Sequence, residues 1–355
     1  MRRRLFAGIA LLALATPAIA QRRVEQFYYP GSFNWSFLRN FPEAARLFNA
    51  FDYGHAVLYE HLYASPDRAT PLLEREFRFL TTDLLVRPPR FAVAEEAVMP
   101  SYARVAWRAK AMFDWAHLLH RQIYDVYADP RIPPADKSAL VERLTDLYLA
   151  NRDLAFTEAP KDMALMDEQH FSQVFRKAHP RFNGLIWAYH WLQVGLYEPL
   201  IAETEPAAQK SGVQETLSRF WAMLDSAPSR MPEVMPMTAA VAPRFSERHP
   251  RAAIVFDNLH MMHDIISDVL ASDRIPRAEK GAEIDRQLAE FRDPGRNLMS
   301  LEHWRMMGEM MGGVEKMGGV AYPGRAAAPK PPAEEHRHPP RGAGQLPVSA
   351  RTQSR

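Results

Sequence analysis

The sequence contains no cysteine. Without thiols the chain forms no disulfide bond and offers no thiolate metal ligand and no cysteine nucleophile. Covalently attached c-type haem is excluded as well, because its attachment needs a Cys-x-x-Cys-His motif. Stability must therefore come from packing or from a metal ion held by histidine and carboxylate side chains.

The sequence also lacks an excess of charge of either sign. The 44 Lys and Arg residues and the 42 Asp and Glu residues leave a formal net charge of +2, too small to indicate a nucleic-acid partner. The sequence has no Gly-rich phosphate loop, no Gly-x-Ser-x-Gly elbow and no His-Glu-x-x-His motif. These absences remove the common signatures of catalysis, and the sequence leaves open whether the protein is an enzyme.

The first twenty residues have the pattern of a secretory signal peptide. Three arginines at positions 2–4 precede an apolar run over residues 5–15, and small residues around Ala18 and Ala20 form a cleavage site before Gln21. The sequence therefore predicts a periplasmic or secreted protein that loses residues 1–20. The paired arginines leave the choice between the general and the twin-arginine export routes open.

The mature chain is expected to be all-α. No alternation typical of strands occurs, and helical periodicity predicts a bundle of about eight to ten helices, several of them starting at a proline. Residues 21–41 form an aromatic, irregular segment, and residues 42–321 form the helical domain. Residues 322–355 are rich in Pro, Ala and Arg, which predicts a disordered tail.

One stretch, residues 182–203, predicts a helix at the centre of the bundle. Between Phe182 and Ile201 it is apolar on every side, which is typical of a helix surrounded by other helices. About 20 such residues suffice to cross a membrane, but four polar side chains make a crossing costly. We therefore expect no transmembrane span in the mature chain and a buried position for the four polar residues, Asn183, His190, Gln193 and Glu198.

A carboxylate three residues before a histidine recurs along the chain, and helical phase separates these pairs. Asp52 and His55 share the apolar face of their helix, so we expect them to point inward. Phase indicates a solvated face for two other sets of residues. These are Asp114 with His117, and the stripe Asp257, His260, Asp264 and Asp268.

Phase leaves a small set of inward-pointing groups, in which His190 is expected to meet His55, with Asp52 beside it. Imidazole and carboxylate ligands suit Fe, Cu, Mn or Zn, so the set predicts a metal or redox-cofactor site. Histidines outnumber carboxylates, so a mononuclear, copper-like or bis-His haem site fits no worse than a di-iron site. The candidate ligands are Asp52, His55, His120, His190, Glu198 and His263.

Two alternatives remain open. The buried histidines can be purely structural, in a non-catalytic cell-envelope protein that binds or assembles with a protein partner. Methionines near the C-terminus, Met306, Met307, Met310 and Met311, can hold Cu(I), although their spacing is also that of a helix packing on the core, which we favour. His336 and His338 lie in the expected tail and can bind metal only weakly.

Overall fold

The computed structural model describes residues 35–227 and 230–324, and in these residues the fold is all-α with no strand. The expected fold class is thereby confirmed. The expected signal peptide lies outside the described residues, as does the tail beyond Gly324. The chain divides after Tyr322 into two units, and the helices described below belong to the first.

Five of the long helices begin at a proline. α3 (Pro42–Ala64), α8 (Pro134–Ala150), α11 (Pro180–Gly195), α13 (Pro206–Asp225) and α16 (Pro250–Ala271) each carry proline in the first turn. In the first turn of a helix the backbone N–H groups have no partner within the helix, so proline, which lacks an N–H, fits there without losing a hydrogen bond.

The helical segment from Pro100 to Ala128 is divided at Ala106 into α6 (Pro100–Val105) and α7 (Trp107–Ala128). Short helices join the long ones, and α2 falls in the segment expected to be irregular. The remaining elements are α2 (Trp35–Asn40), η1 (Pro66–Arg68), α4 (Ala69–Phe79), the π-helical turn η2 (Leu80–Leu84), α5 (Glu95–Val98), α9 (Ala164–Asp167), α10 (Val174–Ala178), α12 (Tyr197–Ala202), α14 (Thr238–Val241), α15 (Pro243–Arg248), α17 (Lys280–Arg292), α18 (Leu301–Met310) and η3 (Val314–Met317).

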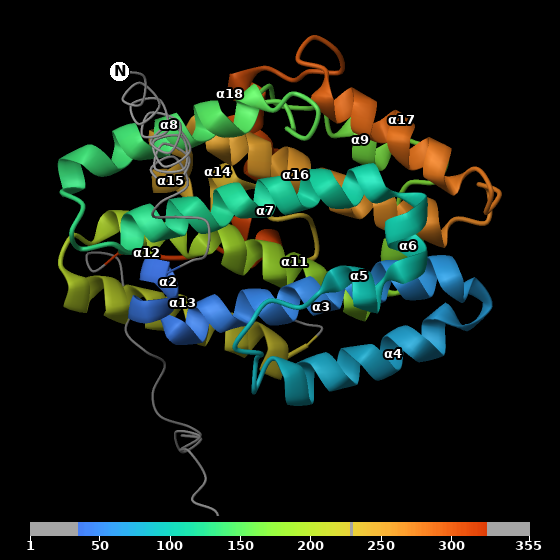
Figure 1. Cartoon of the computed structure of the whole chain (residues 1–355), viewed down its shortest axis with the longest axis horizontal. Coiled ribbons are helices and arrows are strands. Elements are labelled where there is room, and N and C mark those ends of the chain that lie inside the picture. The colour runs from blue at the N-terminus through green and yellow to red at the C-terminus, as the bar shows by residue number, and fades with distance from the viewer. Residues whose placement is uncertain (1–34, 228–229, 325–355) are drawn as a thin grey trace, which may run out of the picture. The chain divides into compact units, whose positions relative to one another are not determined.

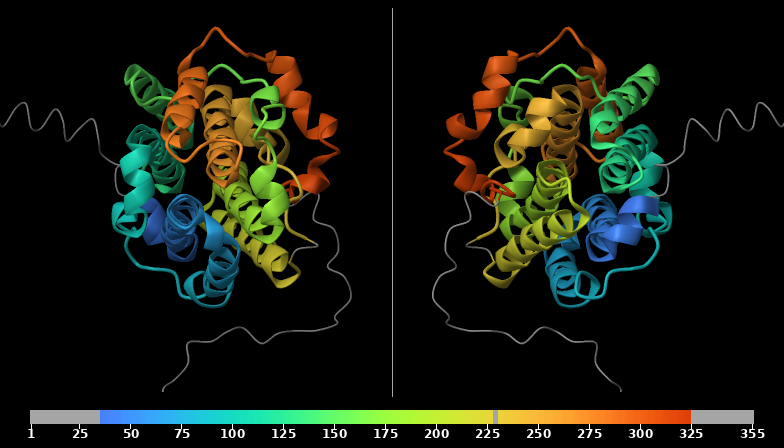
Figure 2. Two further views of the ribbon diagram at one scale, coloured as in Figure 1. Left: turned by 90° about the vertical axis from the view of Figure 1, so that its right-hand side faces the viewer. Right: turned by 90° about the vertical axis from the view of Figure 1, so that its left-hand side faces the viewer.

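Four long helices, α3, α7, α11 and α16, meet at the centre of this unit (Figure 1). α3 packs against both α11 and α16, and α16 packs against α7. Figure 2 looks along the axes of several of these helices and shows the shorter elements arranged around them. The four helices can therefore direct side chains into one common interior.

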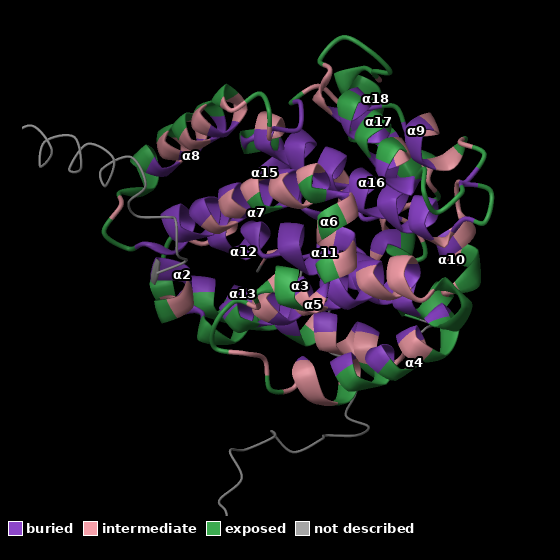
Figure 3. Cartoon of the chain, turned by 45° about the vertical axis from the view of Figure 1, so that its right-hand side comes forward, coloured by how far each residue is buried: buried purple, intermediate pink, exposed green. Residues whose placement is uncertain are grey.

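The predicted central helix is confirmed. Every residue from Phe182 to Ile201 is buried, and the helix is interrupted at Leu196, between α11 and α12. α16 is equally central, because every residue from Ala252 to Leu270 is buried, whereas α4 and α8 expose one face (Figure 3). In the described part of the chain, no helix combines the length and apolar character that crossing a membrane requires.

The burial of α16 corrects the prediction that its acidic stripe faces water. Asp257 accepts hydrogen bonds from the backbone and hydroxyl of Thr238, at 2.9 and 2.6 Å, and from the indole of Trp304 at 2.7 Å. Asp268 accepts two backbone N–H bonds from the segment that enters α10, and Asp264 pairs with an arginine of α10. Donors from packed segments take the place of water and offset part of the cost of burial, although burial still raises the pKa of each of these carboxyl groups.

Candidate metal centre

Six histidines from the four central helices are buried close together. Each is at most 9% exposed, and ring contacts connect all of them. His55 and His263 lie 4.4 Å apart between ring centroids, and His190 and His260 stack at 4.2 Å. We name this group the histidine cluster: His55 of α3, His117 and His120 of α7, His190 of α11, and His260 and His263 of α16.

Three members of the cluster converge on one point. Potential ligand atoms of His55, His190 and His263 all lie within 4.8 Å of one another. The Nε2 atoms of His55 and His190 are 3.2 Å apart, which confirms the expected meeting of these two residues. Two nitrogens that each bind a metal at about 2.0–2.1 Å, with an angle between perpendicular and tetrahedral, lie about 2.9–3.4 Å apart. This separation is that of two ligands of one ion, and without an ion it is also that of a hydrogen bond between the two rings.

The hydrogen bonds around these rings leave nitrogen lone pairs in the interior. His55 Nδ1 lies 3.1 Å from the carbonyl oxygen of Phe51, which can only accept, so Nδ1 carries the proton and Nε2 carries a lone pair. His263 Nδ1 lies 2.5 Å from the hydroxyl of Tyr59, and its Nε2 has no partner among the described residues. A metal-bound histidine is usually held in this way, with its other nitrogen bonded to a second group.

Burial keeps the cluster neutral. It lowers the pKa of His55 and of His117 to about 3, and it lowers the pKa of the other four histidines well below the usual value. Neutral imidazole is the form that binds metal. Leaving a buried polar atom unpaired costs about 1–3 kcal/mol, and coordination would remove this cost for the nitrogen that binds the ion, such as His263 Nε2. Among the described residues, the unpaired atoms of the cluster are His117 Nε2, His120 Nε2, His190 Nδ1, His263 Nε2 and both ring nitrogens of His260.

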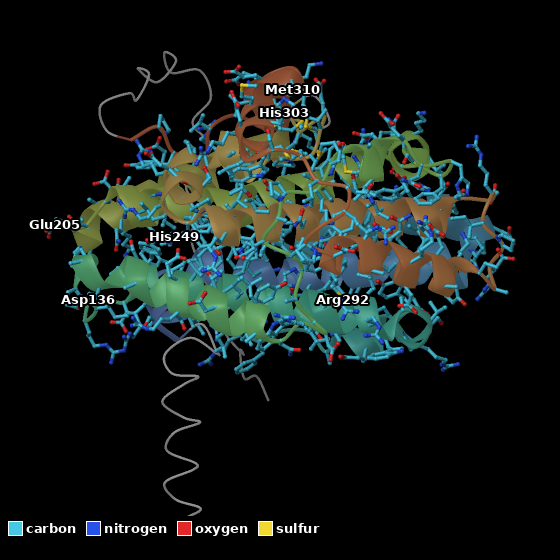
Figure 4. All side chains as sticks on the ribbon, turned by 90° about the horizontal axis from the view of Figure 1, so that it is seen from above. Asp136, Glu205, His249, Arg292, His303 and Met310 are labelled. Carbon is cyan, nitrogen blue, oxygen red and sulfur yellow. The ribbon has the colours of Figure 1, made fainter. Side chains whose placement is uncertain are left out.

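A seventh buried histidine, His249, shows what a structural histidine looks like in this protein (Figure 4). His249 is 0% exposed, and both of its ring nitrogens have hydrogen-bond partners. Nε2 lies 2.7 Å from the hydroxyl of Tyr127, and Nδ1 lies 3.1 Å from a carboxylate oxygen of Glu142. Burial alone therefore does not leave histidine nitrogens unpaired in this fold.

The structure does not bring the remaining predicted ligands into the convergent group of three. Asp52 is buried beside the cluster, but its carboxylate pairs with Arg121 at 2.8 Å. Glu198 accepts bonds from Arg244 at 3.0 Å and from the backbone of Phe245 at 2.9 Å. His120 belongs to the histidine cluster but not to the convergent group of three. Its Nδ1 lies 2.7 Å from the Tyr197 hydroxyl.

Helical phase missed two members of the cluster. His260 lies on the buried stripe of α16, and His117 is 9% exposed although its helix face was expected to be solvated. Neighbours on that face of α7 are paired rather than hydrated, since Arg121 binds Asp52 and Lys110 binds Glu95. No signal in the sequence distinguishes such a covered polar face from a hydrated one.

A small cavity adjoins two of the three converging histidines, His55 and His263. Its volume is about 10 Å³, room for about one water molecule. α5 covers it, where Glu95 and Lys110 form an ion pair at 3.1 Å with both side chains largely buried, and burial raises the pKa of Glu95 to about 8. The lining residues are His55, Tyr59, Glu95, Met99, Tyr102, Lys110, Phe113, His117 and His263.

The C-terminal methionines divide between packing and exposure. Met307 is buried, in accord with the favoured packing interpretation. Met306 and Met310 on the same helix, α18, are 42% and 61% exposed. Met310 is labelled in Figure 4. Neither belongs to the histidine cluster.

A glycine sets the distance between the helices that carry His55 and His190. A Cβ atom at Gly54 would lie 2.8 Å from Cε2 of Tyr189, and the Tyr189 ring is fixed by stacking on Phe51 at 4.0 Å. Alanine in a helix gains about 1 kcal/mol over glycine, but overpacking a core costs about 1–3 kcal/mol. We expect Gly54→Ala to lower the free energy of unfolding in urea by about 1–2 kcal/mol.

The matched control for this prediction is the same substitution in a Tyr189→Leu background, where the ring is absent. The loss caused by Gly54→Ala should then be smaller, as a double-mutant cycle would measure. An equal loss in the two backgrounds would show that the contact with Tyr189 does not limit the approach of α3 to α11.

No protein-family model, curated protein or solved structure matches the chain. The fold and the site therefore have to be interpreted from this chain's own residues. Together they define an all-α protein with a buried histidine cluster that could hold a metal ion.

Proposed function

We propose that the protein is an exported metalloprotein in which His55, His190 and His263 bind one transition-metal ion. The observation that carries the proposal is the convergence of three neutral imidazoles from three helices within 4.8 Å. The unpaired nitrogens support it, because the structural histidine His249 has none. Closing to coordination distance requires a movement of about 1 Å, which metal-free sites commonly show.

The ligand set favours copper or zinc. Three imidazoles without a carboxylate suit these ions, whereas manganese and non-haem iron sites in proteins usually include carboxylate oxygens. Asp52 and Glu198, the carboxylates expected to contribute, are held by arginines. Among divalent first-row ions, Cu²⁺ has the highest affinity for a given set of nitrogen ligands.

An ion with three protein ligands keeps a position for one further ligand. The adjoining cavity of about 10 Å³ has room there for a water molecule or a molecule of similar size. The site is therefore suited to activating water or to redox chemistry with a small molecule such as dioxygen. Tyr59 orients His263, and Glu95, whose pKa burial raises to about 8, lies in the same cavity as a group that can accept or release a proton.

Export is the second part of the proposal and is supported by the signal-peptide pattern of residues 1–20. An exported location also accords with a metal site that uses no cysteine.

Metal analysis of the full chain isolated from the periplasm of its native host tests both parts. We expect close to one equivalent or more of copper or zinc, lost in His190→Gln and retained in the control His249→Gln, which removes an equally buried histidine outside the cluster. Metal at background level in the unaltered chain would leave the histidines a structural role, as in an envelope binding or assembly protein. Absence of the chain from the periplasmic fraction would refute export alone.

A further inference from the structure

The proposed metal site uses three of the six histidines of the histidine cluster and gives no role to the other three. His117, His120 and His260 are each at most 9% exposed, and four of their ring nitrogens have no partner among the described residues. Both nitrogens of His260 are included, so this ring donates to and accepts from no other group in the described part of the chain. We infer that these three histidines form a second metal-binding position beside the first, so that the cluster holds a pair of ions.

The hydrogen bonds of His120 prepare its Nε2 as a ligand. The Tyr197 hydroxyl lies 2.7 Å from His120 Nδ1 and also donates to the His120 carbonyl at 3.3 Å. The hydroxyl has one proton, so both contacts are hydrogen bonds only when Nδ1–H donates to the phenol oxygen. The lone pair of His120 then resides on Nε2, the atom without a partner. This is the arrangement that Phe51 imposes on His55 in the first position.

The two positions adjoin each other through stacked rings. His260 stacks on His190 with centroids 4.2 Å apart and planes 8° apart, and His117 lies 5.8 Å from His263. His120 and His260, on facing helices, have centroids 6.1 Å apart. The histidines of the first position lie closer, at 4.4 to 5.4 Å between centroids. Among the described residues, only the three histidines of the first position bring ligand atoms within 4.8 Å of one another. The second position is therefore more open and requires a larger closing movement, and we expect it to bind its ion more weakly.

A second cavity accompanies the second position. It has a volume of about 10 Å³ and is lined by His117, His120 and Gln193 together with Phe48, Asp52, Arg121 and Tyr124. The side-chain oxygen of Gln193 is buried and has no partner among the described residues, so it is available as an oxygen ligand. His117 lines both cavities and so lies between the two positions.

Copper titration of the purified, chelator-treated full chain tests the inference, which rests on the proposed function. We expect two equivalents of Cu²⁺ to bind in two steps. In two-metal sites the ions lie about 3.5–4 Å apart, so their unpaired electrons couple. The electron paramagnetic resonance signal per copper should be full at one equivalent and should fall as the second binds.

Variants assign the second step to its residues. We expect His260→Gln and His120→Gln to bind one equivalent with the full signal per copper. Their affinity for the first ion should stay within about threefold, because neither residue binds that ion, whereas removing a group that orients one of its ligands typically costs about 10–100-fold. His249→Gln should behave as the unaltered chain does. Circular dichroism and thermal midpoints check that each variant is folded, and two variants are used so that the failure of one to fold leaves the test intact.

The outcomes separate this inference from the proposed function. One equivalent in the unaltered chain, with His260→Gln and His120→Gln unchanged, would overturn the second position and leave the first. If the unaltered chain and both variants bind two equivalents without loss of signal, the second ion binds elsewhere and the second position is also overturned. Loss of that ion in a His336→Gln/His338→Gln chain would then show that it binds at these two histidines. No binding at all would overturn both proposals.

Discussion

Metal-free protein is expected to lose stability in two stages as the pH falls, slowly from about pH 6 to 4 and steeply below about 4. The histidine cluster causes the loss. Unfolded histidine has a pKa of about 6.5, whereas in the folded protein burial lowers the pKa of His55 and His117 to about 3 and that of the other four further below the usual value. Below about pH 6.5 only the unfolded state takes up these six protons, so the free energy of unfolding falls with pH.

Four buried carboxylates oppose this loss until about pH 4. Burial raises their pKa values in the folded protein, so the folded state takes up their protons before the unfolded state does, and acid stabilises the fold through them. These groups are Glu95, with a pKa of about 8, Asp264, about 7, and Asp257 and Asp268, about 6 each. The difference of six and four leaves about two protons, or about 3 kcal/mol per pH unit, between pH 6 and 4. Burial also lowers the pKa of His179 and His249 and raises that of Asp114 and Glu198, and these two pairs oppose each other.

Below about pH 4 the carboxylates of the unfolded state are protonated as well, and the six histidines act unopposed. The loss of stability per pH unit then becomes steeper. Urea denaturation between pH 7.5 and 3.5 measures both stages. His117→Gln should reduce the slope between pH 6 and 4 by about 1.4 kcal/mol per unit. A free energy of unfolding that stays constant or rises from pH 6 to 4 would contradict the neutrality of the cluster.

Added copper or zinc is expected to raise the thermal midpoint of the metal-free chain by roughly 10 °C. An ion that binds only the folded state at about 1,000 times its dissociation constant adds about 4 kcal/mol. For domains of about 150–250 residues, 1 kcal/mol shifts the midpoint by about 2–4 °C. His190→Gln should abolish most of the shift, because it removes the nitrogen 3.2 Å from His55 Nε2.

The control for this shift is again His249→Gln, which should lower the starting midpoint but keep the increase on adding metal. A chelator should reverse the increase in the unaltered chain. An increase of the same size in His190→Gln would mean that the ion binds away from the histidine cluster, for example at the exposed Met306 and Met310.

The parts of the fold that the sequence predicts correctly depend on local rules. Prolines in the first turn mark the starts of α3 and α16 because only a helix start tolerates the missing N–H. The helix from Phe182 is apolar on all sides, so any packing arrangement buries it. His55 meets His190 because each side chain points inward from a central helix, a direction that helical phase predicts.

The parts that could not be predicted depend on partners distant in the sequence. Phase cannot distinguish a stripe that faces water from one that faces donors on other segments, and Trp304 lies 47 residues from Asp257, which it binds. His260 was therefore assigned to a hydrated face together with its acidic neighbours. Glu198 was correctly expected inside, but its direction is set by Arg244 and the backbone of α15, which sequence periodicity does not place.

The three proposed ligands come from separate helices, and this fixes the order in which the fold and the metal site form. His55 and His190 are 135 residues apart, and His263 lies a further 73 residues along the chain, from 263 minus 190. Closing such long loops is slow and costs entropy, so these contacts form late in folding. An ion bound by ligands a few residues apart can nucleate a fold, but an ion bound here has no complete site until α3, α11 and α16 have docked. The rate of metal capture by a refolding chain will therefore follow the docking of these helices.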